Sequence, residues 1–82
     1  MLAVSKMELA GKNGRMFHIH FRKKTNGTMR YMRCVLPKDH DRKNIKNNLM
    51  YVFDDLDKKL KQIDITNIVE VVGDQWVWNK NG

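Results

Sequence analysis

The sequence predicts a mainly-β protein, a small antiparallel barrel of five to six strands with a short N-terminal helical turn. Short apolar runs rich in β-branched and aromatic residues recur at roughly 8–12-residue spacing, and turn-forming residues separate them. A chain of 82 residues has room for only one small core. Closure of the sheet into a barrel would remove the exposed edges that an open sheet of this size presents.

Residues 1–14 predict one or two helical turns, because apolar residues recur there at imperfect helical spacing. Gly11 and Gly14 would end this helix before the first strand. We expect the segment to pack across an open end of the sheet or to be partly flexible. Its apolar stripe consists of Leu2, Met7, Leu9 and Ala10.

Residues 15–36 predict a β-hairpin, which is the strongest element of the chain. Asn26 and Gly27 lie between two runs of β-branched, aromatic and methionine residues. This dipeptide favours a two-residue type I′ turn, in which both central residues have φ > 0. A two-residue loop also determines the register, and counting back from it pairs Arg22 with Tyr31.

This register sorts the hairpin side chains into two faces, because directly opposed residues share a face. One face is apolar and is expected to join the core: Phe17, Ile19, Phe21, Met32, Cys34 and Leu36. The other face is polar, cationic and partly aromatic: His18, His20, Arg22, Tyr31 and Arg33. Three more cations are expected near the hairpin tip: Lys23, Lys24 and Arg30.

The second half of the chain predicts the remaining strands. Pro37 ends the second hairpin strand, and residues 38–48 form a polar, mostly basic loop with Ile45 as its only apolar anchor. A loop of this length is either mobile or a binding element. Short turns rich in Asp, Asn or Gly separate the later strands. These strands are predicted at residues 49–53, 60–65, 68–72 and 75–78.

The connection lengths between the strands are typical of an SH3- or Sm-like barrel. A long connection follows the second strand, a tight turn follows the third, and a very short turn precedes the fifth. We expect a single domain, 1–82, with a helical or flexible segment before the barrel and a polar tail after it. These three parts are residues 1–14, 15–78 and 79–82.

Positive charge is concentrated in one half of the chain. Residues 1–46 contain twelve lysines and arginines against three acidic residues, a net charge of +9. Residues 47–82 contain four basic and six acidic residues, a net charge of −2. Such a basic half suits a polyanion or an acidic protein surface as partner, and the alternative is that the charge serves solubility alone.

The single cysteine, Cys34, has no partner for an internal disulfide and lies on the predicted core face, so we expect a reduced, cytoplasmic protein. The chain has no apolar run of about 18 residues, and no charged segment precedes a long apolar one. We therefore expect neither a membrane span nor a secretory signal.

One set of residues runs with fixed spacing through the hairpin and the strands that follow it. It consists of Phe21, Lys23, Asn26, Gly27, Arg30, Met32, Arg33, Cys34 and Leu36, then Val52, Phe53 and Asp54, then Ile63, Ile65 and Ile68. Over roughly residues 16–72, this pattern resembles a family of small, mostly bacteriophage-encoded proteins with an Sm-like SH3 β-barrel related to the WYL domain.

The resemblance implies a phage accessory protein of the host cytoplasm, with a barrel fold and no known catalytic site. WYL-type domains are thought to sense ligands or nucleic acid, which would suit the basic hairpin. One position departs from the family pattern: members often carry an aromatic residue and an arginine entering the fourth strand, where this chain has Leu60 and Lys61. A ligand contact by that pair is therefore not transferred.

The first functional hypothesis is that the protein binds RNA, or single-stranded nucleic acid more generally. Small barrels bind such strands by stacking bases on exposed aromatic rings while lysines and arginines contact phosphates. Tyr31, surrounded by cations, is the predicted stacking residue, and the alternative is a merely solvated strand face. Three cations of the long loop are expected to extend the surface: Arg42, Lys43 and Lys46.

The sequence predicts a binding protein rather than an enzyme, without a metal or cofactor. His18 and His20 share a strand face, but a third and a fourth metal ligand are missing. The acidic cluster at residues 54–57 favours turn capping over metal binding or acid–base chemistry. Cys34 is expected to be buried and inert, so no nucleophile is predicted.

The second hypothesis is a protein-directed inhibitor of a host defence enzyme, such as a nuclease or the toxin of a toxin–antitoxin pair, with RNA as a part of the complex. A third is a structural subunit of an Sm-like oligomer. Trp76 and Trp78 have the same strand parity, and the default expectation is that they close the core. Exposed, they would instead indicate a contact with a partner or within a homodimer.

Overall fold

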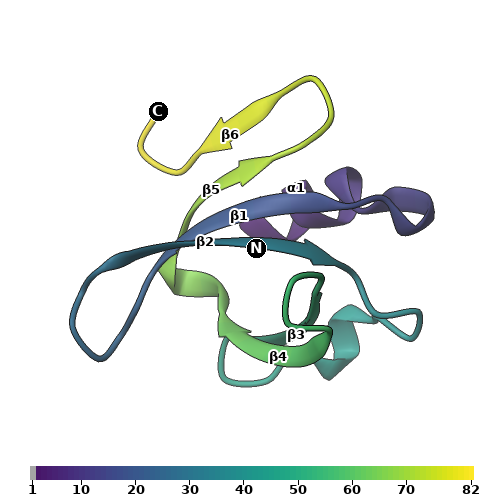
Figure 1. The fold of residues 1–82 in the computed structure, drawn as a ribbon, viewed down its shortest axis with the longest axis horizontal. Helices are drawn as coiled ribbons and strands as arrows, with labels where there is room; N and C mark the ends of the chain where they lie inside the picture. The colour runs from purple at the N-terminus through teal and green to yellow at the C-terminus, as the bar shows by residue number, and fades with distance from the viewer. Residues whose placement is uncertain (1) are drawn as a thin grey trace.

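In the computed structural model, which describes residues 2–82, one helix is followed by six strands in a single antiparallel sheet (Figure 1). This confirms the predicted mainly-β fold class. The helix is α1 (Leu2–Ala10) and the strands are β1 (Phe17–Arg22), β2 (Met29–Val35), β3 (Leu49–Asp54), β4 (Lys59–Asp64), β5 (Ile68–Val72) and β6 (Val77–Asn79). Three short 3-10 helices connect them: η1 (Lys12–Gly14), η2 (Arg42–Asn44) and η3 (Ile65–Asn67).

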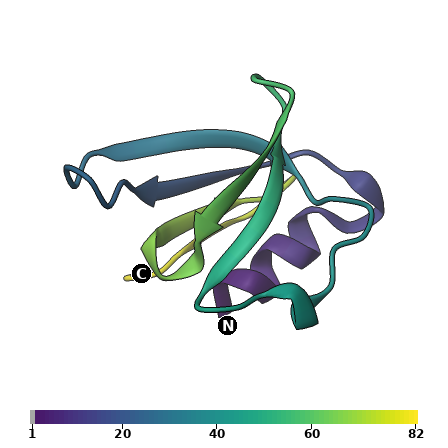
Figure 2. The same cartoon turned by 90° about the horizontal axis from the view of Figure 1, so that it is seen from below.

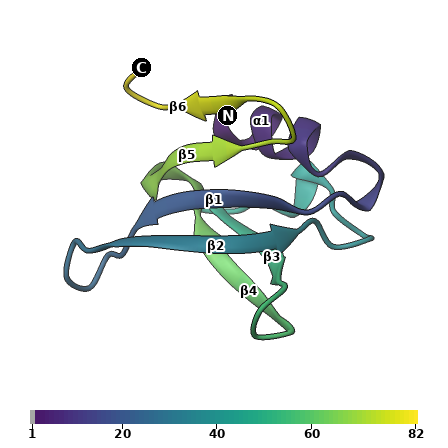
Figure 3. The same cartoon turned by 45° about the horizontal axis from the view of Figure 1, so that its top comes forward.

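The strands are ordered β4-β3-β2-β1-β5-β6, so β4 and β6 form the two edges of an open sheet. The β3–β4 pair turns away from β1 and β2 and crosses beneath them, which curves the sheet strongly (Figures 2 and 3). η3 connects β4 directly to β5, although β4 is an edge strand on one side of β1 in the strand order and β5 is the neighbour of β1 on the other side. The structure thus keeps the small antiparallel architecture without closing its edges.

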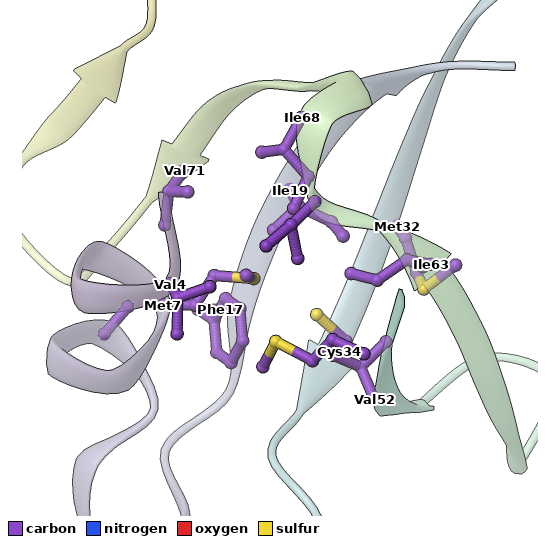
Figure 4. Close-up of a cluster of buried hydrophobic side chains, with 13 residues drawn as sticks. Val4, Met7, Phe17, Ile19, Met32, Cys34, Val52, Ile63, Ile68 and Val71 are labelled. Atoms are coloured by element: carbon purple, nitrogen blue, oxygen red, sulfur yellow. The ribbon is translucent and has the colours of Figure 1, made fainter. Parts of the chain in front are cut away.

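The core lies between the concave face of the sheet and α1 (Figure 4). Phe17, Ile19, Met32 and Cys34 are buried there, as predicted for the apolar face of the hairpin, and Phe21 and Leu36 pack against them half-buried. Burial of each large apolar side chain stabilises the fold by roughly 1.5–3 kcal/mol. The remaining core residues are Val4, Met7, Ala10, Met50, Val52, Ile63, Ile65, Ile68 and Val71.

The N-terminal helix is confirmed, but its buried stripe differs from the predicted one. Val4 and Met7 face the core, whereas Leu2 and Leu9 are exposed. The helix ends where the backbone N–H of Gly11 bonds the Met7 carbonyl at 2.8 Å. A Cβ on Gly11 would lie 2.9 Å from the Phe17 ring, so the glycine permits close packing of the helix end on β1. Met1, part of the predicted segment, lies outside the described residues.

The predicted hairpin register is wrong by two residues. Tyr31 lies opposite His20 rather than Arg22, and Arg22 pairs with Met29. A shift of two keeps every side chain on its predicted face, because side chains alternate with a period of two along a strand. The two faces of the hairpin are therefore as predicted, although the partners across the strands are not.

The error arises in the turn, which contains four residues instead of two. Lys23 N–H bonds the Thr28 carbonyl at 2.8 Å and closes the loop, while Gly27 N–H bonds the Lys23 carbonyl at 2.9 Å. Gly27 has φ of 72°, but Asn26 does not adopt positive φ. Its side-chain Oδ1 instead accepts from the Thr28 N–H at 3.1 Å, which is an Asx-type contact.

A two-residue turn with both φ values positive does occur, but elsewhere in the chain. Asn47 and Asn48 have φ of 55° and 63°, and Leu49 N–H bonds the Lys46 carbonyl at 3.0 Å. The preceding loop is ordered by η2, whose N-terminus is capped by an Asp41 carboxylate oxygen. Ile45 packs half-buried against the core, which confirms the predicted anchor.

The predicted tail also needs a correction. β6 ends at Asn79, which pairs with Glu70, so the segment 79–82 begins inside the last strand. Trp76 and Trp78 are half-buried and pack against the core cluster. This is the default role expected from their parity.

Candidate functional site

Three neighbouring strands bring the residues of the candidate site into one row. His20 on β1 lies opposite Tyr31 on β2 and opposite Glu70 on β5. The Tyr31 hydroxyl donates a hydrogen bond of 2.8 Å to Glu70 Oε1. Because this bond reaches from β2 to β5, the Tyr31 ring extends across β1 on the outer face of the sheet.

The Tyr31 ring lies flat on the imidazole beneath it. Its centroid is 4.3 Å from that of His20 and the two planes differ by 18°, a stacked geometry. His18 meets the same ring edge-on, with centroids 6.4 Å apart. Despite these contacts Tyr31 is 59% exposed. We call His18, His20 and Tyr31 the aromatic platform.

Glu70 orients the platform and places a negative charge at its β5 edge. Its hydrogen bond raises the pKa of the Tyr31 hydroxyl above the ordinary value. The sequence did not single out Glu70, because the hairpin pattern alone does not predict which later strand lies beside β1. Strict alternation along β5 would place Glu70 on the same face as the buried Ile68. The pairing irregularity between His20–Glu70 and Phe21–Ile68 breaks this alternation, and no signal in the sequence predicts it.

Two arginines of the predicted outer face flank the platform along the hairpin. Arg33 lies opposite His18, where its Nε contacts Met16 and stands 3.5 Å from Asp55 Oδ2. Arg22 lies at the other end of β1, and its Nη1 donates to the Gly27 carbonyl at 2.9 Å. Both side chains are exposed, so the platform has a cation on either side.

The three tip cations do not share the platform face. Lys24 Nζ forms an ion pair of 2.7 Å with Asp64 Oδ2, which lowers the pKa of that carboxyl to about 2 with help from Thr66. Arg30 lies opposite Phe21, on the inner side of the hairpin beyond the core. Arg30 and Lys23 form no ion pair with any carboxylate among residues 2–82.

Two of the three loop cations, Arg42 and Lys43, belong to η2 and lie far from the hairpin tip, since η2 and the tip are at opposite ends of the molecule (Figures 1 and 3). Arg42 donates to Glu8 Oε1 from Nε at 2.9 Å and from Nη2 at 2.6 Å, and also to Ser5 Oγ. His40 Nε2 lies 2.8 Å from the other Glu8 oxygen. These contacts lower the pKa of Glu8 and raise that of Arg42. Lys43 is exposed next to Arg42 in η2, and Lys46 is exposed at the turn into β3, where it forms a β-bridge with Leu49.

Other reactive side chains have structural roles. Burial, with the nearby Asp54 charge, raises the pKa of the Cys34 thiol to about 12. Asp54 is itself buried and accepts from the backbone N–H groups of Leu56 and Asp57, as predicted for a turn-capping acid. Its other oxygen pairs with Lys61 at 2.8 Å, and this cation lowers the pKa of Asp54. Within the described part of the chain, no three His, Cys, Asp or Glu side chains converge on a metal site.

Across residues 2–82, no helix has the length and hydrophobicity required to cross a membrane. Comparison of the chain with protein-family models, with curated proteins and with solved structures gives no match. The resemblance of residues 16–72 to the phage barrel family therefore stays a prediction.

Proposed function

We propose that this protein binds single-stranded nucleic acid, RNA in the first place, on the outer face of β1 and β2. The observation that carries the proposal is the Tyr31 ring, which is held flat over His20 and fastened to Glu70 while its outer side stays exposed. A ring fixed in this way loses little conformational freedom when a base stacks on it.

In the proposed complex, one base stacks on the aromatic platform and the neighbouring phosphates contact Arg33 and Arg22. Base–aromatic stacking contributes roughly 1–3 kcal/mol per base and tolerates any sequence. Glu70 repels phosphates from the β5 side of the platform. The strand would therefore run along the hairpin rather than across the sheet.

The resemblance of residues 16–72 adds a biological setting to this proposal. The protein would act as a phage accessory protein in the host cytoplasm, where it would shield RNA or bring it to a host protein. The net charge of +7 supports a polyanionic partner.

The test is fluorescence anisotropy with a labelled single-stranded RNA across a salt series. The logarithm of affinity should fall with the logarithm of salt concentration by about 0.7 per phosphate contacted. Tyr31→Ala should weaken binding roughly 5- to 150-fold, because the stacking surface is lost. Tyr31→Phe keeps the ring but loses the hydroxyl that bonds Glu70, so its affinity should lie between those of the wild type and Tyr31→Ala.

Tyr51→Ala is the matched control, because Tyr51 is a tyrosine of similar exposure, 49%, on β3. Absence of RNA binding at low salt, or equal binding by Tyr31→Ala and Tyr51→Ala, would overturn the proposal. A pull-down from host extract, with and without nuclease treatment, tests the protein-directed alternative. A host protein retained after nuclease treatment would favour an inhibitor of a toxin or nuclease.

A further inference from the structure

A groove of about 480 Å³ lies on the inner side of the hairpin tip, between the tip and β4. It exists because β2 and β3 share only two residue pairs, Cys34 with Asp54 and Val35 with Phe53. The two strands diverge beyond these pairs, so the tip half of the β1–β2 hairpin extends past β3 and β4 (Figure 3). The inner side of the tip is therefore left uncovered.

The groove combines an apolar floor with polar walls. Phe21, Met32 and Ile63 line it from β1, β2 and β4, at the end of the core. Gln62 and Asn67 are also lining residues, and an amide side chain has both hydrogen-bond donors and acceptors. One site thus offers an apolar contact surface and groups able to recognise a polar edge.

The charge of the groove is unbalanced. Its two carboxylates are already paired, Asp64 with Lys24 at 2.7 Å and Asp54 with Lys61 at 2.8 Å. Arg30 and Lys23 also line the groove, and in the described chain neither has a carboxylate partner. The site therefore carries excess positive charge next to an apolar floor, which favours an anion with a flat or apolar body.

We infer that this groove binds one nucleotide unit, with its base on the apolar floor and its phosphate against Arg30 and Lys23. The volume lies in the range of roughly 300–1,000 Å³ that is usual for small-ligand sites. The guanidinium of an arginine binds phosphate through paired hydrogen bonds. In this complex the amides of the lining residues Gln62 and Asn67 would pair with the polar edge of the base, whereas an aliphatic acid would offer them no such partner.

A free mononucleotide and one nucleotide of a bound strand present the same chemistry to this groove. Tyr31 and Arg22 belong both to its lining and to the outer surface, so the groove adjoins the platform across the edge of β2. If the bound nucleotide belongs to an RNA strand, the inference rests on the proposed function, because the RNA must then pass from the platform into the groove. The mononucleotide source does not depend on the platform.

Isothermal titration with uridine monophosphate and adenosine monophosphate tests the groove directly. Arg30→Ala should weaken binding at least roughly tenfold, because a charge-assisted contact to phosphate is lost. Lys59→Ala is the matched control, since Lys59 is an exposed cation at the start of β4 outside the groove lining. The methyl resonance of Met32, on the groove floor, should shift on addition of nucleotide in the wild type only.

The same variants are then titrated with the labelled RNA. Loss of mononucleotide binding in Arg30→Ala supports a free nucleotide, and loss of RNA affinity alone supports a nucleotide of the strand. The inference is overturned if Arg30→Ala and Lys23→Ala bind both probes as Lys59→Ala does, or if inorganic phosphate binds as tightly as a nucleotide.

These results are separable from the platform proposal. If Arg33→Ala and Tyr31→Ala lose RNA affinity while Arg30→Ala and Lys23→Ala keep full affinity for both RNA and mononucleotide, the platform stands and the groove inference fails. If Arg30→Ala loses mononucleotide binding while Arg33→Ala and Tyr31→Ala keep full RNA affinity, the groove stands and the platform fails.

Discussion

The hairpin and the loop between β2 and β3 are both rich in basic residues, but the fold uses the two sets differently. In the loop, Arg42 is held by Glu8 and Ser5 and fastens η2 to α1. In the hairpin, Lys24 and Arg33 each pair with a carboxylate of a later strand or turn, whereas Arg30 and Lys23 have no carboxylate partner within residues 2–82. A count of charges therefore identifies no binding surface, because availability depends on which carboxylates the fold brings near.

The largest expected effect is on RNA affinity, when the same number of charges is reversed in the hairpin and in the loop. The double variant Arg22→Glu with Arg33→Glu should lose roughly 100-fold in RNA affinity, because two phosphate contacts are replaced by repulsion. The double variant Arg42→Glu with Lys43→Glu changes net charge equally and should lose less than roughly tenfold, since its charges act only at long, screened range. Anisotropy with RNA measures both.

The loop variant should also have a lower Tm, because the substitution at Arg42 places a second carboxylate beside Glu8. Equal losses of affinity in the two double variants would show that RNA binding follows total charge and not the hairpin surface.

The next effect concerns stability alone. Glu8→Ala removes the acceptor of His40 and of Arg42, and we expect a loss of about 1 kcal/mol in the free energy of unfolding, since the cluster is partly exposed. For a domain of this size, such a loss lowers Tm by roughly 4–8 °C. RNA affinity should not change. Asp74→Ala, at an exposed acid of the β5–β6 turn, is the control and should leave Tm unchanged.

A smaller effect concerns the ion pair of the hairpin tip. The pKa of Asp64 is about 2 in the folded state, below its ordinary value, so this carboxylate stabilises the fold at neutral pH. That contribution is lost as pH falls from about 4 to about 2, where the folded form takes up its proton. Lys24→Gln should raise the pKa of Asp64, as carboxyl NMR titration would measure. An unchanged Asp64 pKa would mean that Thr66 and the backbone, rather than Lys24, hold it down.

The smallest effect is expected at an unpaired loop cation. Lys43→Ala should change RNA affinity by less than about twofold and Tm by almost nothing, because exposed charges contribute only a few tenths of a kcal/mol. A larger loss of affinity, together with a reduced salt slope, would extend the binding surface to η2.

The two faces of the hairpin followed from the sequence, but the residue pairs across its strands and the buried stripe of α1 did not. The alternation of side chains along a strand, with a period of two, assigned Phe17 and Cys34 to the core correctly although the predicted turn length was wrong. The turn predicted at Asn26 and Gly27 does not form, because the Asn26 side chain accepts a hydrogen bond from Thr28. A turn of the predicted type, with both φ values positive, forms instead at Asn47 and Asn48. Asn and Gly tolerate positive φ at both turns, so residue type alone does not determine which turn type each one adopts.

The candidate site was predicted in part for a similar physical reason. His20 and Tyr31 were assigned to the exposed face, but their stacking depends on the actual register. The Tyr31–Glu70 and Glu8–Arg42 contacts join residues 39 and 34 positions apart in the chain. No local sequence pattern predicts contacts over such separations. The groove arises from the divergence of β2 and β3, which is a property of the whole sheet.

The stacking of Tyr31 on His20 also provides a spectroscopic signal for ligand binding. The His20 ring protons lie in the ring current of Tyr31, so their chemical shifts depend on the tilt and distance of that ring. A base that lands on the outer side of Tyr31 adds a second ring current, whereas a ligand that displaces the tyrosine removes the first. Unlabelled RNA can therefore be followed at His20, and the direction of the shift distinguishes a strand that stacks on the tyrosine from one that displaces it.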